Sequence, residues 1–377
     1  MKRITIVGAG FAALAALRRL RKRGFDGEIT VLAPEPRFLY YPSLIWIPTG
    51  LRRAKDLYLP LEGLFARYRA RFVKGEARAV EAEGRVLRTE SGTLEQDALI
   101  IASGGRSLKA LPGIEHTLAI CDPFDAEKIR ERLAALSKGR IAVGFAGNPK
   151  EPQAVRGGPA FELLFGLDTH LRREGRREAV ELVFFNPMTE PGNRLGAKAV
   201  RRLLAEMGER GIRTHLGHKL KGFSERAVHT EGGDVEADLI LFLPGLTGPA
   251  WAAEGGLPLS PGGFIRADTT CAVAGMRGVF VAGDAGSYEG APEWLPKQGH
   301  MADLQGATAA DNALLALSGK EAAERFRPEI VCIVDTLSSG VLVYRTPSRA
   351  IVLPNPLWHA AKRAFEWHYL RPLRRAA

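Results

Sequence analysis

Three small residues near the start of the chain stand at the spacing Gly-x-Gly-x-x-Ala: Gly8, Gly10 and Ala13. They lie between an apolar run at residues 4–7, typical of a buried strand, and leucines at helical spacing within residues 11–20. In such a turn the first glycine permits the tight bend, the second lets a pyrophosphate approach the backbone, and the small third residue lets the helix pack on the strand. The free N–H groups and the dipole of the helix favour an anion. The pattern therefore predicts a bound dinucleotide.

An acidic residue follows the next predicted strand. That strand is expected at residues 28–32, about 20 residues after the turn, which is the separation this kind of site requires. Glu35 comes just beyond its end and is a candidate to bond the ribose hydroxyls. The alternative is an ordinary turn between a strand and a helix, which the flanking elements make the weaker interpretation.

The three cysteines, Cys121, Cys271 and Cys332, are the candidates for sulfur chemistry. Their wide spacing excludes a zinc knuckle and a Cys-x-x-Cys redox pair. An odd number in an intracellular context argues against a framework of structural disulfides. We expect no metal site.

The bulk composition bounds the class of protein. The chain has 377 residues, 46% hydrophobic content, 42 glycines and a net charge of +11, which suggests a loop-rich α/β protein of two or three units. The positive charge favours a membrane surface, nucleic acid or acidic substrates, but no basic arm or nucleic-acid motif supports the second. We find no secretory signal pattern and no apolar run of about 18 residues, so we expect a cytoplasmic protein or one on the cytoplasmic face of a membrane.

The order of apolar segments predicts an α/β fold with two Rossmann-like units of the dinucleotide-binding type. Residues 1–112 and 264–320 are expected to form the first, and residues 113–263 the second. A C-terminal region of short strands and one helix is expected at residues 321–377.

The second unit offers little for a dinucleotide. The turn after its predicted strand at residues 140–146 contains Gly144 and Gly147 but no glycine triplet. The strand at residues 179–185 ends in Asn186 and Pro187, with no acid for a ribose. Both features count against a nicotinamide site.

Two further runs carry a family resemblance. Asp97-x-Leu-Ile-Ile-Ala-Ser103-Gly104 and Val281-Ala-Gly283-Asp284-Ala resemble the motifs of flavin-containing disulfide-reductase-like proteins, with Ser103 in place of threonine. With the opening turn, they resemble flavoproteins with two dinucleotide domains. The resemblance implies FAD, with Asp284 bonding its ribityl chain. The expected cofactor contacts are Gly8, Gly10, Phe11, Ala12, Glu35, Pro42, Ala102, Ser103, Gly104, Gly283, Asp284, Lys297 and Gly299.

Within that group the chain most resembles the sulfide:quinone oxidoreductases, along nearly its whole length. The resemblance implies a membrane-associated FAD enzyme that oxidises sulfide, or a related sulfur nucleophile, through cysteine and passes electrons to quinone. Lys297 would stabilise negative charge on the reduced flavin. The runs that carry the resemblance are Pro42-Ser43-Leu-x-Trp46, Gly158-Pro-Ala-Phe-Glu162, Thr189-Glu-Pro191, Lys297-x-Gly-x-Met-Ala302 and Ala361-Lys-x-Ala-Phe-Glu366.

The resemblance assigns two of the cysteines and replaces a third. Cys121 and Cys332 stand where the family has its first and last cysteines, whereas Arg156 occupies the place of the middle one. Cys121 then either partners Cys332 in a rearranged redox pair or bonds the flavin covalently. Cys271 has no family counterpart, and we expect it to pack in the core.

Other residues near the expected sulfur site carry charge. Arg156 would lower the pKa of a nearby thiol and attract hydrosulfide, or else lie on the surface. Glu162 resembles the family's proton-handling carboxylate, and its alternative role is to complement a helix N-terminus. The family's histidines at the sulfide site are replaced by Asp125 and by Asn193 or Arg194.

The predicted terminal helix bears on the acceptor. A helical wheel over residues 357–370 predicts a polar side with His359, Lys362, Arg363 and Glu366. A basic amphipathic helix with tryptophan and tyrosine is typical of an in-plane membrane anchor, and docking on the protein core or another subunit is the alternative. We expect quinone entry near Phe365 and Tyr369. The expected broad apolar face holds Trp358, Ala361, Ala364, Phe365 and Tyr369, and Arg371, Arg374 and Arg375 follow.

Two alternatives to this function remain open. One is a quinone reductase similar to the type II NADH dehydrogenases, which the second turn disfavours. The other is a sulfur-binding flavoprotein without turnover, suggested by Arg156 in place of a cysteine. Homo-oligomerisation is also possible.

Overall fold

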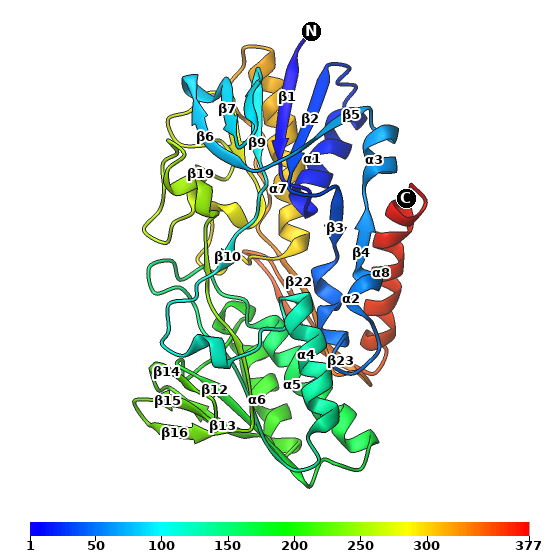
Figure 1. The fold of residues 1–377 in the computed structure, drawn as a ribbon, viewed down its shortest axis with the longest axis vertical. Coiled ribbons are helices and arrows are strands. Elements are labelled where there is room, and N and C mark those ends of the chain that lie inside the picture. The colour runs from blue at the N-terminus through cyan, green and yellow to red at the C-terminus, as the bar shows by residue number, and fades with distance from the viewer. Residues whose placement is uncertain (377) are drawn as a thin grey trace.

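A computed structural model describes residues 1–376, and its first unit is built on a parallel sheet (Figure 1). The five strands lie in the order β20-β9-β1-β2-β5, so the two strands that carry the motifs of the resemblance are neighbours on one side of the opening strand. Helices α1 (Phe11–Lys22) and α7 (Gly299–Leu317) pack together on this sheet. The strands are β1 (Arg3–Val7), β2 (Glu28–Ala33), β5 (Ala70–Lys74), β9 (Ala98–Ile101) and β20 (Val279–Val281).

The second unit has a four-stranded parallel sheet in the order β13-β12-β11-β17. Its buried strands run through Phe145, Phe184 and Phe242, which are almost fully enclosed. The strands are β11 (Gly139–Phe145), β12 (Val180–Asn186), β13 (Arg213–Leu216) and β17 (Leu239–Leu243), and the helices are α4 (Pro123–Ala135), α5 (Gly158–Arg173) and α6 (Ala197–Glu209).

The C-terminal region joins an antiparallel sheet to the last helix. Strands β22 (Ile330–Asp335), β23 (Gly340–Arg345) and β24 (Ala350–Asn355) pair in that order. Helix α8 (Trp358–Arg374) then runs along one side of the molecule, past β4 and α2 (Figure 1). It therefore closes over the same side as the segment around residues 40–57.

Smaller elements complete the fold. Residues 41–46 form a 3-10 helix, η1 (Tyr41–Trp46), with a proline in its first turn. Two short helices are α2 (Ala54–Leu57) and α3 (Glu62–Arg67). The remaining strands are β3 (Arg37–Leu39), β4 (Tyr58–Pro60), β6 (Ala77–Glu81), β7 (Val86–Thr89), β8 (Gly92–Glu95), β10 (Arg106–Ser107), β14 (Leu220–Ser224), β15 (Ala227–Thr230), β16 (Gly233–Glu236), β18 (Leu246–Thr247), β19 (Ile265–Asp268) and β21 (Gly286–Glu289).

The mixed α/β fold with parallel sheets confirms the predicted fold class. The predicted elements all exist, with ends displaced by a few residues. Residues 72–74 belong to the parallel sheet through β5, and β6–β8 form a separate small antiparallel sheet. The boundaries of the three predicted units stay a prediction.

Candidate functional site

The opening glycine turn has the geometry that a pyrophosphate requires. Gly8 has φ +113, and a Cβ there would lie 2.3 Å from the carbonyl oxygen of Ala102, so only glycine fits. At Gly10 a Cβ would meet no protein atom within 4 Å. Helix α1 begins at the next residue, and no side chain caps its N-terminus. Its free N–H groups are therefore available to an anion.

The three cofactor motifs meet at one edge of the first sheet. Strand β1 lies beside β9, and β9 lies beside β20, all parallel, so the carboxyl ends of these strands converge. Gly8, Ser103 and Asp284 follow these three ends. Ligands of open α/β sheets bind at this edge, so these residues fit FAD.

Glu35 lies two residues beyond β2, where a ribose contact was expected. Its side chain is half exposed and forms an ion pair with Arg37. The neighbour of β2 in the sheet is β1, which carries the glycine turn. The role of Glu35 in binding the ribose stays a prediction.

Close packing supports the turn from behind. A Cβ at Gly306 of α7 would lie 2.2 Å from the carbonyl oxygen of Ala12 in α1, so glycine permits the two helices to touch. A Cβ at Gly299 would lie 3.0 Å from the Phe11 ring. Phe11 and Ala12 therefore fix the start of α1 against α7. Gly306 was not identified from the sequence, because a single glycine in a helical pattern carries no ligand signal.

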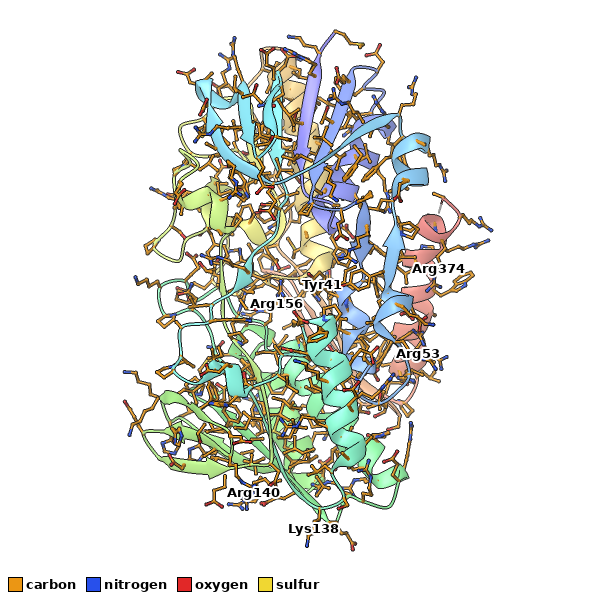
Figure 2. All side chains as sticks on the ribbon, in the orientation of Figure 1. Tyr41, Arg53, Lys138, Arg140, Arg156 and Arg374 are labelled. Carbon is orange, nitrogen blue, oxygen red and sulfur yellow. The ribbon has the colours of Figure 1, made fainter. Side chains whose placement is uncertain are left out.

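Arg156 joins the second unit to the flavin motif of the first. It forms an ion pair with Asp284, and the side chain lies in the middle of the molecule near Tyr41 (Figure 2). Burial opposes its charge, but Asp284 and the neighbouring Cys121 outweigh burial and raise the pKa of Arg156. The surface alternative for Arg156 is therefore wrong. Because Asp284 was expected to bond the ribityl chain, Arg156 reaches the cofactor side of the site.

Cys121 is the thiol on this side of the site. It precedes Asp122, which caps helix α4, and the Arg156 guanidinium lies near enough to act on its charge. Burial raises the pKa of Cys121, whereas Arg156 lowers it. Arg156 acts in the expected direction, but burial outweighs it, so the pKa of Cys121 lies above its usual value.

Cys332 has different neighbours. It lies on β22, and a Cβ at Gly158, the first residue of α5, would be 3.8 Å from its Sγ. Burial and, to a smaller extent, the nearby Glu162 raise its pKa to about 12, although Lys362 acts in the opposite direction. Cys121 and Cys332 are both free thiols in this structure. The rearranged pair between them is not formed here.

Glu162 and Lys362 form a buried ion pair beside Cys332. Glu162 is 6% exposed and accepts a hydrogen bond from Lys362 of α8. Lys362 Nζ also lies 3.4 Å from the carbonyl oxygen of Ile333. Burial raises the pKa of Glu162 to about 7, although Lys362 and its hydrogen bond lower it. A carboxyl group with this pKa can both accept and release a proton near neutral pH.

A second buried polar cluster was not identified as a site from the sequence. Asp335 is 1% exposed and accepts a hydrogen bond from Trp46 Nε1 at 2.6 Å. His359 Nδ1 lies 2.9 Å from the other oxygen of the same carboxylate. Next to it, Arg52 donates to Glu366, which is 3% exposed. The helical spacing of residues 359, 362 and 366, which places them on one side of α8, was the sequence feature that could have indicated this cluster.

The terminal helix therefore docks with its polar side. His359, Lys362 and Glu366 face the protein, where each has a partner of opposite or complementary charge. Tyr369 also points inward, and its ring packs on Phe11 at 5.4 Å between centroids. The expected apolar face is thus wrong in part, because a wheel does not show which side finds buried partners.

Other residues of that expected face lie on the outside. Phe365 is 55% exposed, whereas Trp358 is half-buried and donates a hydrogen bond to the carbonyl oxygen of Leu353 at 2.8 Å. Ala364 is exposed, and Ala361 is half-buried. The outward apolar face includes Trp367, which is also 55% exposed and was not expected there.

Two more cations lie near Asp284. Burial lowers the pKa of Lys297 to about 8, and its ammonium group contacts the carbonyl oxygens of Asp284 and Gly286. Burial lowers the pKa of Arg194 to about 10. Arg194 donates to two backbone carbonyls, while its Nε and Nη2 have no hydrogen-bond partner among the described residues. With Arg156, these side chains give the site an excess of positive charge.

Three remaining expectations concern residues outside this cluster. Cys271 is fully buried with its Sγ 3.5 Å from the carbonyl oxygen of Gln305, which agrees with a packing role. Asp125 accepts a hydrogen bond from the backbone N–H of Ala119, and Asn193 is exposed. Pro42 begins η1.

The described residues, 1–376, contain no cluster of three or more histidine, cysteine or acidic side chains arranged to hold a metal ion. Within the same residues, every helix is too short or too polar to cross a membrane.

The second unit differs from the first at its turn. Strand β11 ends at Phe145 and α5 begins at Gly158, so an extended loop replaces the tight glycine turn. A Cβ at Gly144 would lie 2.5 Å from the backbone and ring of Phe185, so this glycine serves packing between strands. The N-terminus of α5 instead lies against Cys332.

Comparisons with known proteins agree with this architecture. The profile described as pyridine nucleotide-disulphide oxidoreductase matches residues 2–309. The sulfide-quinone reductase of Aquifex aeolicus is 24% identical over 99% of this chain and 91% of its own length. A type II NADH:quinone oxidoreductase of Staphylococcus saprophyticus is 22% identical over 85% of this chain and 83% of its own length.

Solved structures show the same fold. The sulfide:quinone oxidoreductase of Aquifex aeolicus superposes with a TM-score of 0.91 at 22% identity, covering 100% of this chain and 92% of its own. NDH2 from Plasmodium falciparum in complex with NADH gives a TM-score of 0.75 at 10% identity, covering 98% and 94%. The resemblance to sulfide:quinone oxidoreductases drawn from the sequence is confirmed as a resemblance.

The profile match covers most of the chain, and the converging motifs at β1, β9 and β20 fit FAD. This protein is therefore an FAD-dependent oxidoreductase and belongs to the pyridine nucleotide-disulphide oxidoreductase family.

Proposed function

We propose that the chain is a peripheral membrane enzyme that oxidises sulfide through Cys332 and passes the electrons, by way of FAD, to quinone. The observation that carries this proposal is the place of the Cys332 thiol. It lies between the start of α5 and the buried Glu162–Lys362 pair, and Lys362 belongs to the terminal helix. The Glu162–Lys362 pair therefore connects the Cys332 site to α8, the helix that exposes apolar side chains on its other side.

Glu162 is the base in this proposal. The Cys332 thiol has a pKa of about 12, so it does not ionise unaided near neutral pH. Glu162, with a pKa of about 7, accepts the thiol proton as the sulfur reacts, and Lys362 stabilises the carboxylate between turnovers. The adjacent N-terminus of α5 stabilises the thiolate that forms.

The reaction balances with one quinone for each sulfur atom. One S–S bond forms between Cys332 and a hydrosulfide ion, and the two S–H protons and two electrons reduce quinone to quinol. Bound FAD supplies the two-electron acceptor between sulfur and quinone. The persulfide left on Cys332 passes its outer sulfur to a second hydrosulfide ion, which releases a hydrogen disulfide ion (HSS⁻) and leaves the Cys332 thiolate. One proton from solvent then restores the thiol.

Positive charge draws the anionic substrate inward. Three cations lie within electrostatic reach of Asp284: Arg156, Arg194 and Lys297. Of these, Arg156 forms an ion pair with the Asp284 carboxylate. We propose that Arg156, in place of a cysteine, binds hydrosulfide and holds Asp284. Cys121 either remains a free thiol beside Arg156 or tethers the flavin, and the second option predicts flavin that survives denaturation.

The outward side of α8 supports membrane association. Five of the nine large hydrophobic side chains that are exposed in the described residues belong to β24, α8 and the short link between them. We propose that this surface lies on the cytoplasmic face of a membrane and admits quinone near Phe365. The side chains are Ile351, Leu353, Leu357, Phe365 and Trp367.

A type II NADH:quinone oxidoreductase is the second candidate, favoured by its similarity in sequence and fold. The extended loop between β11 and α5 counts against a nicotinamide site. Anaerobic addition of sulfide or NADH to the holoenzyme separates the two, because only the electron donor bleaches the flavin absorbance. A flavoprotein that binds sulfur without turnover would reduce no quinone with either donor.

A further inference from the structure

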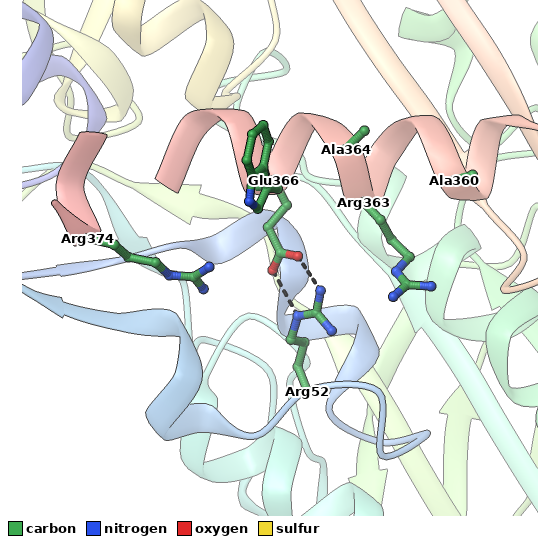
Figure 3. Close-up of a pocket in the computed structure, with 7 residues that line it drawn as sticks. Arg52, Ala360, Arg363, Ala364, Glu366 and Arg374 are labelled. Atoms are coloured by element: carbon green, nitrogen blue, oxygen red, sulfur yellow. Dashed lines mark hydrogen bonds and ion pairs between the residues drawn. The ribbon is translucent and has the colours of Figure 1, made fainter. Parts of the chain in front are cut away.

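A hollow lies beside α8, on the side next to Arg52, and neither Cys121 nor Cys332 lines it (Figure 3). Its volume is about 380 Å³. The side chains of Arg363 and Arg374 reach into it from either side of the Arg52–Glu366 pair (Figure 3). The hollow combines long cationic side chains with a small apolar floor, and no step of the proposed reaction uses it.

The helical spacing explains why the hollow exists. Residues 363, 367 and 374 are four and seven apart, so they lie on one side of an α-helix. Ala360 and Ala364 are one turn apart beside Arg363, and their small side chains leave room next to that arginine.

The hollow carries uncompensated positive charge. Glu366 is already paired with Arg52, whose Nε and Nη2 both donate to its two oxygens. Among residues 1–376, Arg363 and Arg374 make no ion pair with a carboxylate. A guanidinium group offers a planar fork of N–H donors that matches a phosphate or carboxylate. An anion with several oxygens would therefore complete both arginines at once.

The surroundings identify the source of that anion. Trp367 lines the hollow, and its side chain is 55% exposed. On the same helix Phe365 is also 55% exposed, and Leu357, just before the helix, is 71% exposed. A free anion gains nothing from exposed apolar side chains. A lipid headgroup at a membrane surface brings acyl chains to cover them, and basic hollows of this kind bind anionic headgroups.

We propose that Arg363 and Arg374 bind the phosphate of an anionic phospholipid headgroup, with the Trp367 ring beside it at the acyl boundary. This inference rests on the proposed membrane association and adds a specific lipid site to it. The Arg52–Glu366 pair holds α8 against the segment that carries Arg52, between the two arginines.

Vesicle sedimentation of the holoenzyme tests the site. The double variant Arg363→Lys/Arg374→Lys keeps the charge but loses both guanidinium forks. We expect its partitioning onto phosphatidylglycerol vesicles to weaken by about tenfold, since each arginine contributes on the order of a few-fold beyond a simple charge. The control Lys138→Ala, an exposed lysine at the far end of the molecule, should bind as the wild type does (Figure 2).

Three results would overturn the lipid site. Equal binding of wild type and double variant would show that diffuse charge suffices. Equal binding of the wild type to phosphatidylcholine and phosphatidylglycerol would show no preference for an anionic headgroup. Saturable binding of inorganic phosphate at Arg363, without vesicle binding, would assign the hollow to a soluble anion. Sulfide oxidation by the wild type is measured separately in detergent, so failure of the proposed reaction does not alter the vesicle result.

Discussion

Lys362 of the terminal helix donates a hydrogen bond to Glu162, a residue 200 positions earlier in the chain and at the start of α5. The same carboxylate accepts from the backbone N–H of Asp335 at 3.4 Å, on the strand that carries Cys332. The buried Glu162–Lys362 pair therefore connects the strand that carries Cys332 to α8, whose other side is exposed.

Removing Lys362 should loosen this link. In Lys362→Met the buried Glu162 loses its partner and becomes protonated, so we expect a loss of about 1–3 kcal/mol in the free energy of unfolding. Denaturant titration measures it, with Lys138→Met as a matched surface control. A variant as stable as the control would mean that the pair does not hold α8. A double-mutant cycle with Glu162→Gln should give less than the sum of the single effects.

Glu162 should set a pH dependence. Its pKa of about 7 lies above the ordinary 4.5, so it becomes a carboxylate only as the pH rises through about 7. If it is the base, kcat/KM for sulfide rises through that range, after correction for ionisation of sulfide itself. Glu162→Gln should lose the rise and about a hundredfold of the rate. An unchanged profile in the variant would exclude this role.

The same shift has a consequence for stability. Between about pH 4.5 and 7 the folded protein binds the Glu162 proton more tightly than the unfolded chain does. Its contribution to the free energy of unfolding is therefore full below this window and falls as the pH rises through it. Wild type should lose stability relative to Glu162→Gln across that window, measured by denaturation at several pH values.

The cysteines should separate by role. Cys332→Ser cannot form a persulfide, so reduction of the flavin by sulfide should be lost, while the buried Cys271→Ala should retain it. Cys121→Ser distinguishes the two options for that thiol: if Cys121 tethers FAD, wild type retains flavin after denaturation and the variant releases it. Full sulfide turnover in Cys332→Ser would refute the proposed chemistry.

Alanine at Gly8 and alanine at Gly10 should have different effects on stability and flavin content. A Cβ at Gly8 would lie 2.3 Å from a backbone oxygen, so Gly8→Ala should lower both stability and flavin content. A Cβ at Gly10 meets no protein atom, so Gly10→Ala should fold normally but bind FAD weakly. The ratio of flavin to protein absorbance and the Tm report the two effects. Full flavin occupancy in Gly10→Ala would place the pyrophosphate elsewhere.

The sequence predicted most of what depends on local spacing. Gly8, Gly10 and the strand motifs around Ser103 and Asp284 specify their own turns, and parallel pairing then brings them to one edge. The orientation of α8 was not predictable in this way. Its polar residues find buried partners at Glu162, Asp335 and Arg52, and those partners lie far away in the sequence.

The replaced cysteine shows the same limit. Arg156 was recognised as a departure from the family pattern, but its contact with Asp284 depends on how the two units pack. The pKa of Cys121 likewise depends on burial, which outweighs the arginine beside it. The residue types predict whether each neighbour raises or lowers the pKa of Cys121. Which effect is larger depends on burial in the packed structure.

An anaerobic titration of the holoenzyme, followed by flavin absorbance, tests the central claim most directly. Sulfide should bleach the oxidised flavin band, and a short-chain quinone should restore it without NADH. Bleaching by NADH but not by sulfide would contradict the account.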